Sequence, residues 1–105
     1  MIARVWRGWA TPHDADTYER HFRSSVVPHL SEIEGYRGAR LLRRSDGGEE
    51  SFVSITFFDS VDAIRAFAGE DVEAAVVEPE ARRALSRVEE RCTHYTVVVA
   101  DTRDA

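Results

Sequence analysis

The sequence of 105 residues contains no lysine, no asparagine and no glutamine, so its basic residues are all arginine. Fourteen basic and nineteen acidic residues give a net charge of −5 with histidine neutral. That balance argues against nucleic acid or an anionic membrane as a partner, because both need clustered positive charge. The single cysteine, Cys92, rules out an internal disulfide and fits a reducing compartment.

Long apolar runs are also missing, and the start of the chain has no stretch that fits a signal peptide or a membrane span. We therefore expect a cytoplasmic protein. A clustered metal site is not expected either. His13, His21 and His29 are spaced by eight residues, and each such step turns a helix by roughly 80° beyond two full turns. These histidines do not share one helix face, so no metal is predicted.

The hydrophobic pattern predicts a single domain over residues 1–105, of which 101–105 form a polar tail. Asp46, Gly47 and Gly48 form a strong hairpin signal, and Pro28 should kink the first helix. Predicted strands cover residues 2–9, 36–45, 51–59 and 91–100, and predicted helices cover 11–35, 60–69 and 79–90, with the last helix as an extra piece.

This order, β-α-β-β-α-β, predicts an α+β fold of the ferredoxin-like type. Right-handed crossovers place the strands as 4-1-3-2 in an antiparallel sheet with both helices on one face. A chain this short buries a modest fraction of its surface, so a lone sheet covered on one side is marginal. Association with a second copy is the simplest remedy.

Alternation along the strands then assigns the two faces of the sheet. Val53, Ile55 and Phe57 are uniformly apolar, so we place them under the helices. The opposite set mixes aromatic, hydroxyl, arginine and histidine side chains. Such a face is too apolar for water and too polar for an ordinary core, which suits a second sheet packed across a shared cavity.

Three stretches carry a family resemblance: "IARVWRGWATPHDADTYERHF", "FFDSVDAIRAFAGEDVEAAVV" and "PEARRALSRVEERCTHYTVV". They resemble small bacterial proteins of the antibiotic biosynthesis monooxygenase type, in the dimeric α+β barrel superfamily. The resemblance implies a homodimer whose sheets join into a barrel around a ligand cavity. It also implies oxidation of aromatic polyketide intermediates or quinol-like compounds with O2, often without metal, flavin or haem, so no cofactor is expected.

A related branch of that superfamily degrades haem with an Asn, a Trp and a His ligand. This sequence has no asparagine, and the resemblance places Phe67 at the position of the Trp and Val77 at that of the His. We therefore do not expect haem degradation.

Candidate site residues come from the mixed face. His94 titrates near neutrality and suits a general base, and Arg40 suits stabilisation of the resulting anion, so these two are the predicted catalytic pair. For each a structural role is the alternative: a satisfied buried histidine and an interface ion pair. Cys92 lies two residues from His94 and is expected to be an inert buried thiol. The predicted substrate-binding residues are Trp6, Arg4, Ser54, Thr56 and Phe58.

These observations favour a cofactor-independent monooxygenase-like protein acting on a small aromatic or polyketide-derived substrate. Two alternatives stay open. One is a homodimeric ligand-binding or isomerase-type barrel without oxygen chemistry, and the other is a structural or stress-related dimer. An open cavity lined by Arg40 and His94 would favour an enzyme or a binder, whereas a packed one would favour the structural dimer.

Overall fold

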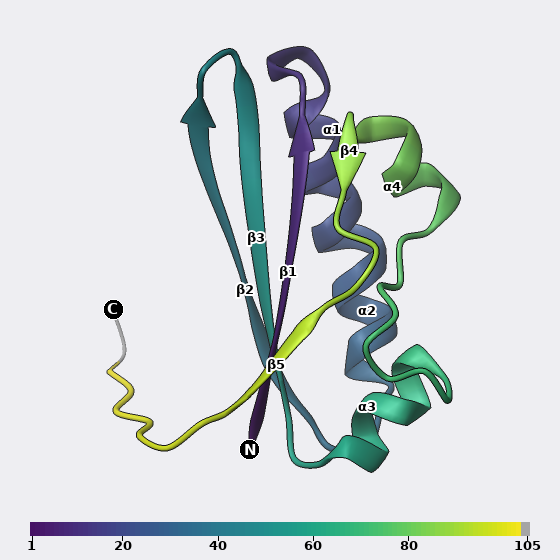
Figure 1. The fold of residues 1–105 in the computed structure, drawn as a ribbon, viewed down its shortest axis with the longest axis vertical. Helices are drawn as coiled ribbons and strands as arrows, with labels where there is room; N and C mark the ends of the chain where they lie inside the picture. Colours follow the sequence, from purple (N-terminus) through teal and green to yellow (C-terminus); the bar gives the residue numbers. More distant parts are fainter. Residues whose placement is uncertain (104–105) are drawn as a thin grey trace.

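The computed structural model describes residues 1–103, and Figure 1 shows a tall sheet with helices packed beside it. Of the expected polar tail, residues 101–103 are exposed and lie outside any helix or strand, whereas 104–105 lie outside the described residues. The strands are β1 (Ile2–Ala10), β2 (Tyr36–Asp46), β3 (Glu49–Phe58), β4 (Arg87–Val88) and β5 (Thr93–Thr96). The helices are α1 (Pro12–His21), the π-helical turn η1 (Phe22–Val26), α2 (Val27–Ser31), α3 (Val61–Ala68) and α4 (Pro79–Ala84).

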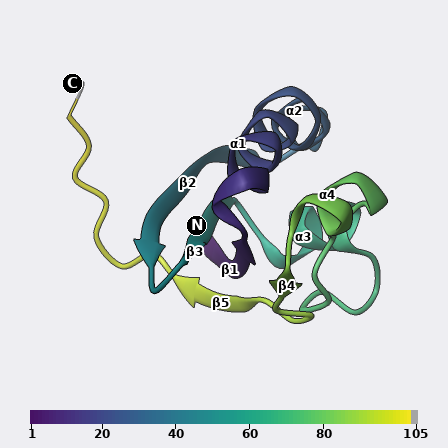
Figure 2. The same ribbon diagram turned by 90° about the horizontal axis from the view of Figure 1, so that it is seen from above.

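The strands form one antiparallel sheet in the order β2-β3-β1-β4, and β5 also pairs with β1. Read from the other edge this is the predicted order 4-1-3-2, so the ferredoxin-like α+β prediction is confirmed. Gly47 and Gly48 make the predicted hairpin between β2 and β3, with φ of 59° and 92°. Figure 2 shows every helix on one side of the sheet.

The first helical run departs from a regular α-helix shortly before Pro28. Thr11 caps its start, because its side-chain hydroxyl accepts a hydrogen bond from the Asp14 amide at 3.3 Å. The helix then widens into η1 and resumes as α2. Proline has no N–H to donate to the helical ladder, so a shift in the hydrogen-bond pattern just before it is expected.

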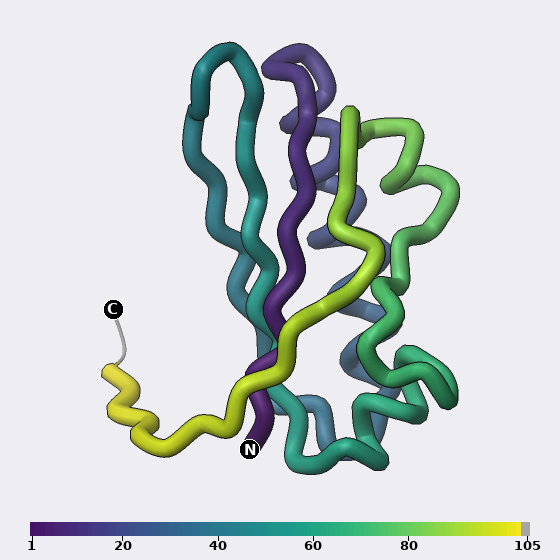
Figure 3. The backbone as a smooth tube through the Cα atoms, viewed as in Figure 1, coloured from purple at the N-terminus to yellow at the C-terminus, as the bar shows by residue number. Residues whose placement is uncertain are grey.

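In the C-terminal third of the chain, the predicted boundaries of one helix and one strand are wrong. The helix expected over 79–90 ends at Ala84, because the chain turns to pair β4 with Gly8 and Trp9 of β1. The strand expected over 91–100 is short and ends at Thr96. Figure 3 shows the segment after β5 running away from the sheet. None of the described helices combines the length and apolar character that crossing a bilayer requires.

The assignment of the sheet faces from the sequence is wrong. Along β3 the fully buried set is the even-numbered one, and Phe52 and Phe58 have no exposed surface. Phe52 packs with Tyr18 of α1, with ring centroids 4.9 Å apart. The uniformly apolar set, Val53, Ile55 and Phe57, is half-buried and lies on the helix-free face. The mixed polar and aromatic face is therefore the one under the helices.

Candidate functional site

A narrow cavity lies between the mixed face of the sheet and the helices. About 50 Å³ of it can hold the centre of a water molecule. Residues of β1, β3, α1, η1, α3 and the 69–78 loop line it, together with Ala81 and Cys92. Within the single chain this open space is small, so it suits only a small molecule.

Arg4 of β1 is the charged group in the floor of this cavity. It is 3% exposed, and no described carboxylate lies within ion-pair distance of its guanidinium. Nη1 donates to the Val72 carbonyl, and Nη2 donates to the Ala74 carbonyl at 2.6 Å. Burial lowers the pKa of Arg4, yet a guanidinium stays protonated near neutrality. Arg4 is therefore a buried positive charge without a counter-ion among residues 1–103, and Nε–H is not used by these contacts.

His94 of β5 is a hydrogen-bond partner of Arg4. Its Nε2 lies 2.9 Å from Arg4 Nη1, and because a guanidinium can only donate, Nε2 is the acceptor. The imidazole is therefore neutral and carries its proton on Nδ1. Burial and then the charge of Arg4 lower the pKa of His94. His94 does not line the cavity, so it contacts Arg4 without contacting the cavity itself.

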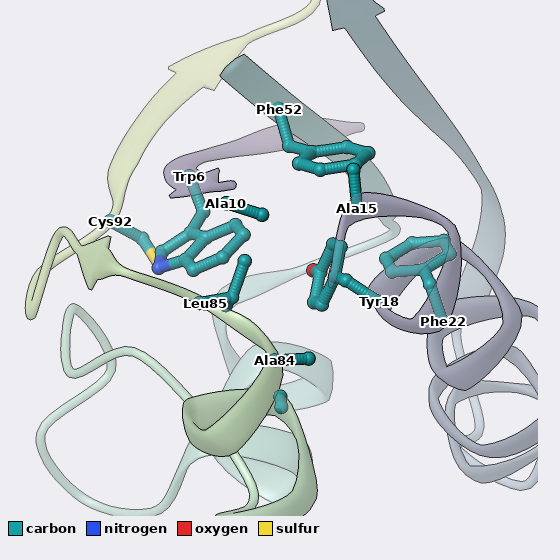
Figure 4. Close-up of a cluster of buried hydrophobic side chains, with 10 residues drawn as sticks. Trp6, Ala10, Ala15, Tyr18, Phe22, Phe52, Ala84, Leu85 and Cys92 are labelled. Atoms are coloured by element: carbon teal, nitrogen blue, oxygen red, sulfur yellow. The ribbon is translucent and has the colours of Figure 1, made fainter. Parts of the chain in front are cut away.

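Aromatic rings make the other walls. Figure 4 shows Tyr18 between Trp6 and Phe22, with Phe52 beside it. The Trp6 ring is fixed at its far end, since Nε1 donates to the Glu89 carbonyl at 2.8 Å. Gly8 makes room for this ring, because a Cβ at that position would overlap it. Burial raises the pKa of Tyr18, so its phenol is neutral at ordinary pH.

The remaining lining groups are small and polar. Ser54 and Thr56 of β3 reach the cavity from the strand next to Arg4, as both were predicted to do within a cavity. Cys92 lies beside Trp6 (Figure 4). Burial raises the pKa of its thiol, and Arg4 offsets that only in part, so Cys92 is protonated and a poor nucleophile.

Two predicted site residues lie elsewhere. Arg40 of β2 pairs in register with Ile55, so its side chain belongs to the helix-free face, opposite to the face of Arg4 and His94. Arg40 borders an open groove with Phe57 and Val97 instead. Phe58 is buried in a second cluster with Leu30 and Ile64. The single cavity expected to contain both His94 and Arg40 is therefore not formed within this chain.

Sequence reasoning missed His21. This residue of α1 lines the cavity and is 7% exposed, yet neither ring nitrogen has a hydrogen-bond partner among the described residues. Nδ1 lies 3.3 Å from Glu80 Oε2, which is close enough for attraction but outside hydrogen-bond geometry. Such a group costs about 1–3 kcal/mol to bury. In the sequence, His21 lies three residues after Tyr18 and therefore on the same apolar face of the helix. This spacing was the signal that could have indicated a buried histidine at the cavity.

The described residues around the cavity do not suit haem or a metal ion. Val77 lines it at the position that the resemblance gives to the haem-ligating histidine, and Val76 beside it is also aliphatic. The open volume of about 50 Å³ is far smaller than a porphyrin. Within residues 1–103, no group of three or more His, Cys, Asp or Glu residues is arranged to hold a metal ion. The residues present do not fit haem.

Fold and cavity together define a ferredoxin-like α+β protein with an aromatic, arginine-floored cavity under its helices. Residues 1–79 match the family model described as antibiotic biosynthesis monooxygenase. The chain therefore belongs to the antibiotic biosynthesis monooxygenase family and is monooxygenase-like. No curated protein sequence matches it.

Solved structures agree on the fold. A monooxygenase from the gene ActVA-Orf6 of Streptomyces coelicolor, in complex with the ligand Nanaomycin D, superposes with a TM-score of 0.62 at 20% identity, covering 98% of this chain and 91% of that one. The heme-degrader MhuD from Mycobacterium tuberculosis, with two hemes bound in its active site, gives 0.64 at 19% identity, covering 97% and 100%. At these identities the likeness concerns the fold alone.

Proposed function

We propose that this protein is a monooxygenase that oxidises a small, flat phenol or quinol-type compound with O2. The observation that carries the proposal is Arg4, a buried guanidinium without a carboxylate partner among residues 1–103, in the floor of a cavity with Trp6 and Tyr18 in its walls. A buried charge needs a partner, and a phenolate or enolate oxygen supplies one. Family membership and the ActVA-Orf6 monooxygenase structure, which holds the ligand Nanaomycin D, support the choice of reaction.

The protein's part in such a reaction is to stabilise the anion from which electrons leave. Removing a proton gives an electron-rich ring, and Arg4 holds the negative oxygen while Trp6 and Tyr18 flank the ring. A ring C–H carbon then becomes a carbonyl as O2 is reduced, with one oxygen atom entering the product, the other leaving as water, and the phenolic and ring hydrogens leaving in that water. The substrate supplies the electrons, so this balance needs no further reductant.

Oxygen uptake tests this proposal. A panel of anthrones, naphthols and quinols should contain compounds that consume one O2 per product only in the presence of the protein. Arg4→Gln should lower the rate about a hundredfold or more, as loss of a buried donor to an oxyanion does. Arg44, exposed on the helix-free face of β2, provides the matched control, and Arg44→Gln should leave the rate unchanged.

Three results would contradict the proposal. Binding of panel compounds without oxygen uptake would favour the ligand-binding or isomerase-type barrel. A comparable loss in Arg40→Gln would place the reaction on the helix-free face, as the sequence alone predicted. An absence of both binding and uptake would favour the structural dimer.

We also propose that two copies associate through the helix-free face. Val5 pairs with Ile55, and Leu42 pairs with Val53, so apolar side chains from β1, β3 and β2 form one half-exposed sheet surface. Leu42 is 49% exposed in the single chain. An exposed apolar patch of this kind, here bordered by Arg40 and Arg44, typically marks an interface. Light scattering of the full chain should give twice its 11.9 kDa mass, and a monomer at micromolar concentration would contradict the dimer.

A further inference from the structure

His21 occupies a position between the cavity and solvent. Of the described residues, it alone lines both the cavity and an outer groove, which Asp14, Thr17, Glu80 and Arg83 also border. The imidazole itself is buried, whereas the Glu80 side chain is 71% exposed. A proton passed from one side of this ring to the other would therefore move from the cavity to the solvent-facing groove.

The unpartnered state of the ring indicates a use beyond packing. Buried polar atoms in folded proteins are nearly always hydrogen-bonded, and exceptions call for an explanation. Both nitrogens of His21 are such exceptions among the described residues. A ligand in the cavity would supply the missing partner on one side of the ring, and a small movement of the Glu80 carboxylate would supply it on the other.

Other titratable groups near the cavity are less suited to take up a proton. The Nε2 lone pair of His94 is occupied by Arg4. Burial raises the pKa of both Tyr18 and Cys92, which keeps each in its protonated form. Glu78 also lines the cavity and is the remaining competitor.

We propose that His21 is the general base of this cavity, which deepens the proposed function and rests on it. The phenolic O–H of the substrate breaks, and its proton forms an N–H bond at Nε2 of a neutral His21. The products of this step are a phenolate held by Arg4 and an imidazolium beside Glu80, so one proton moves and no electrons are exchanged. The imidazolium keeps this proton for as long as the phenolate is bound and releases it to the groove only after the product leaves. Charge is complementary at both ends, with a cation for the phenolate and a carboxylate for the imidazolium.

The test uses the full chain and para-nitrophenol, whose phenolate is yellow and whose neutral form is not. At a pH below its ionisation in water, the probe should turn yellow on binding to the wild-type protein. His21→Gln should still bind the probe, as measured by calorimetry, but in its colourless form. Glu80→Gln should weaken the colour, and Glu78→Gln should leave it. His13, exposed on the same helix, gives the matched control, and His13→Gln should behave as wild type.

The outcomes separate this inference from the proposed function. No binding of the probe to the wild-type protein would contradict the proposed function and the inference with it. Yellow probe in both wild type and His21→Gln, colourless probe bound to wild type, or loss of the colour in Glu78→Gln alone would overturn the role of His21 and leave the proposed function standing.

A stability measurement guards against an unfolded variant. His21→Leu should melt at the same temperature as wild type or higher, since no hydrogen bond within residues 1–103 is lost, while the yellow form disappears. A structural histidine would give the reverse, with a lower melting temperature and the yellow form retained in the folded fraction.

Discussion

The two faces of the sheet differ in a way that inverts the usual expectation. The face under the helices carries Arg4, Ser54 and Thr56 among its aromatic rings, whereas the face without helices carries apolar side chains such as Val5 and Ile55 between exposed arginines. An ordinary core would be the reverse. The polar residues lie inside because they border a cavity, and the uniformly apolar residues lie outside because, as we propose, a second copy covers them. Polarity therefore follows what each face contacts, and the presence of helices does not determine it.

The largest expected effect compares one residue type on the two faces of β3. Phe52→Ala removes a ring with no exposed surface and should cost about 3–5 kcal/mol of unfolding free energy. Phe57→Ala should cost less within one chain, because Phe57 is only half-buried there. In urea unfolding, the destabilisation caused by Phe57→Ala should depend on protein concentration, because Phe57 lies in the proposed dimer interface. A concentration-independent loss for Phe57→Ala would contradict the proposed interface.

A smaller effect concerns the 69–78 loop, which closes the cavity. Arg4 binds the carbonyls of Val72 and Ala74 in this loop, so Arg4→Met should release it while the sheet stays folded. Amide hydrogen exchange should become about tenfold faster or more across 69–78, because the loss of a buried hydrogen-bond partner costs about 1–3 kcal/mol. Arg44→Met is the control on the other face. If hydrogen exchange were unchanged in Arg4→Met, the backbone hydrogen bond from the Cys92 amide to the Glu73 carbonyl would be sufficient to hold the loop in place without Arg4.

The smallest effect is a pH dependence of stability. The pKa of His94 is lowered from its ordinary 6.5 by burial and by Arg4. Its contribution is therefore complete above pH 6.5 and falls as the pH drops below that value, because the unfolded chain takes up a proton that the folded chain does not. His94→Gln keeps an acceptor for Arg4 and should flatten this part of the profile. His13→Gln should not, and an equal slope in all three proteins would contradict the neutral state of His94.

The sequence predicted the element order, the hairpin and the strand order, because glycine pairs, proline and alternating apolar residues act locally. It did not predict which face of β3 lies under the helices. Alternation separates Phe52 and Ser54 from Val53 and Ile55, but it does not say which set meets the helices. We placed the more apolar set, Val53 and Ile55, under the helices because apolar side chains are usually buried within the chain. That rule fails here because the apolar side chains form a surface on the face without helices.

The same error explains the outcome for the site residues. Arg4, Trp6, Ser54 and Thr56 were assigned to one face together, so their gathering around one cavity is as expected even though the face itself was reversed. Arg40 was assigned to the same mixed face as His94, whereas the register puts the two on opposite faces. His21 belongs to a helix, and no argument based on strand alternation can find it.

The space that Gly8 provides for the Trp6 ring constrains how the chain can vary. Gly8 is needed for room rather than for conformation, since a Cβ there would overlap the indole. The side-chain volumes at positions 6 and 8 are therefore coupled, because the indole of Trp6 fills the space that a side chain at position 8 would need. Relatives that carry a side chain at position 8 should carry a smaller residue at position 6, and their cavities should take substrates of a different shape.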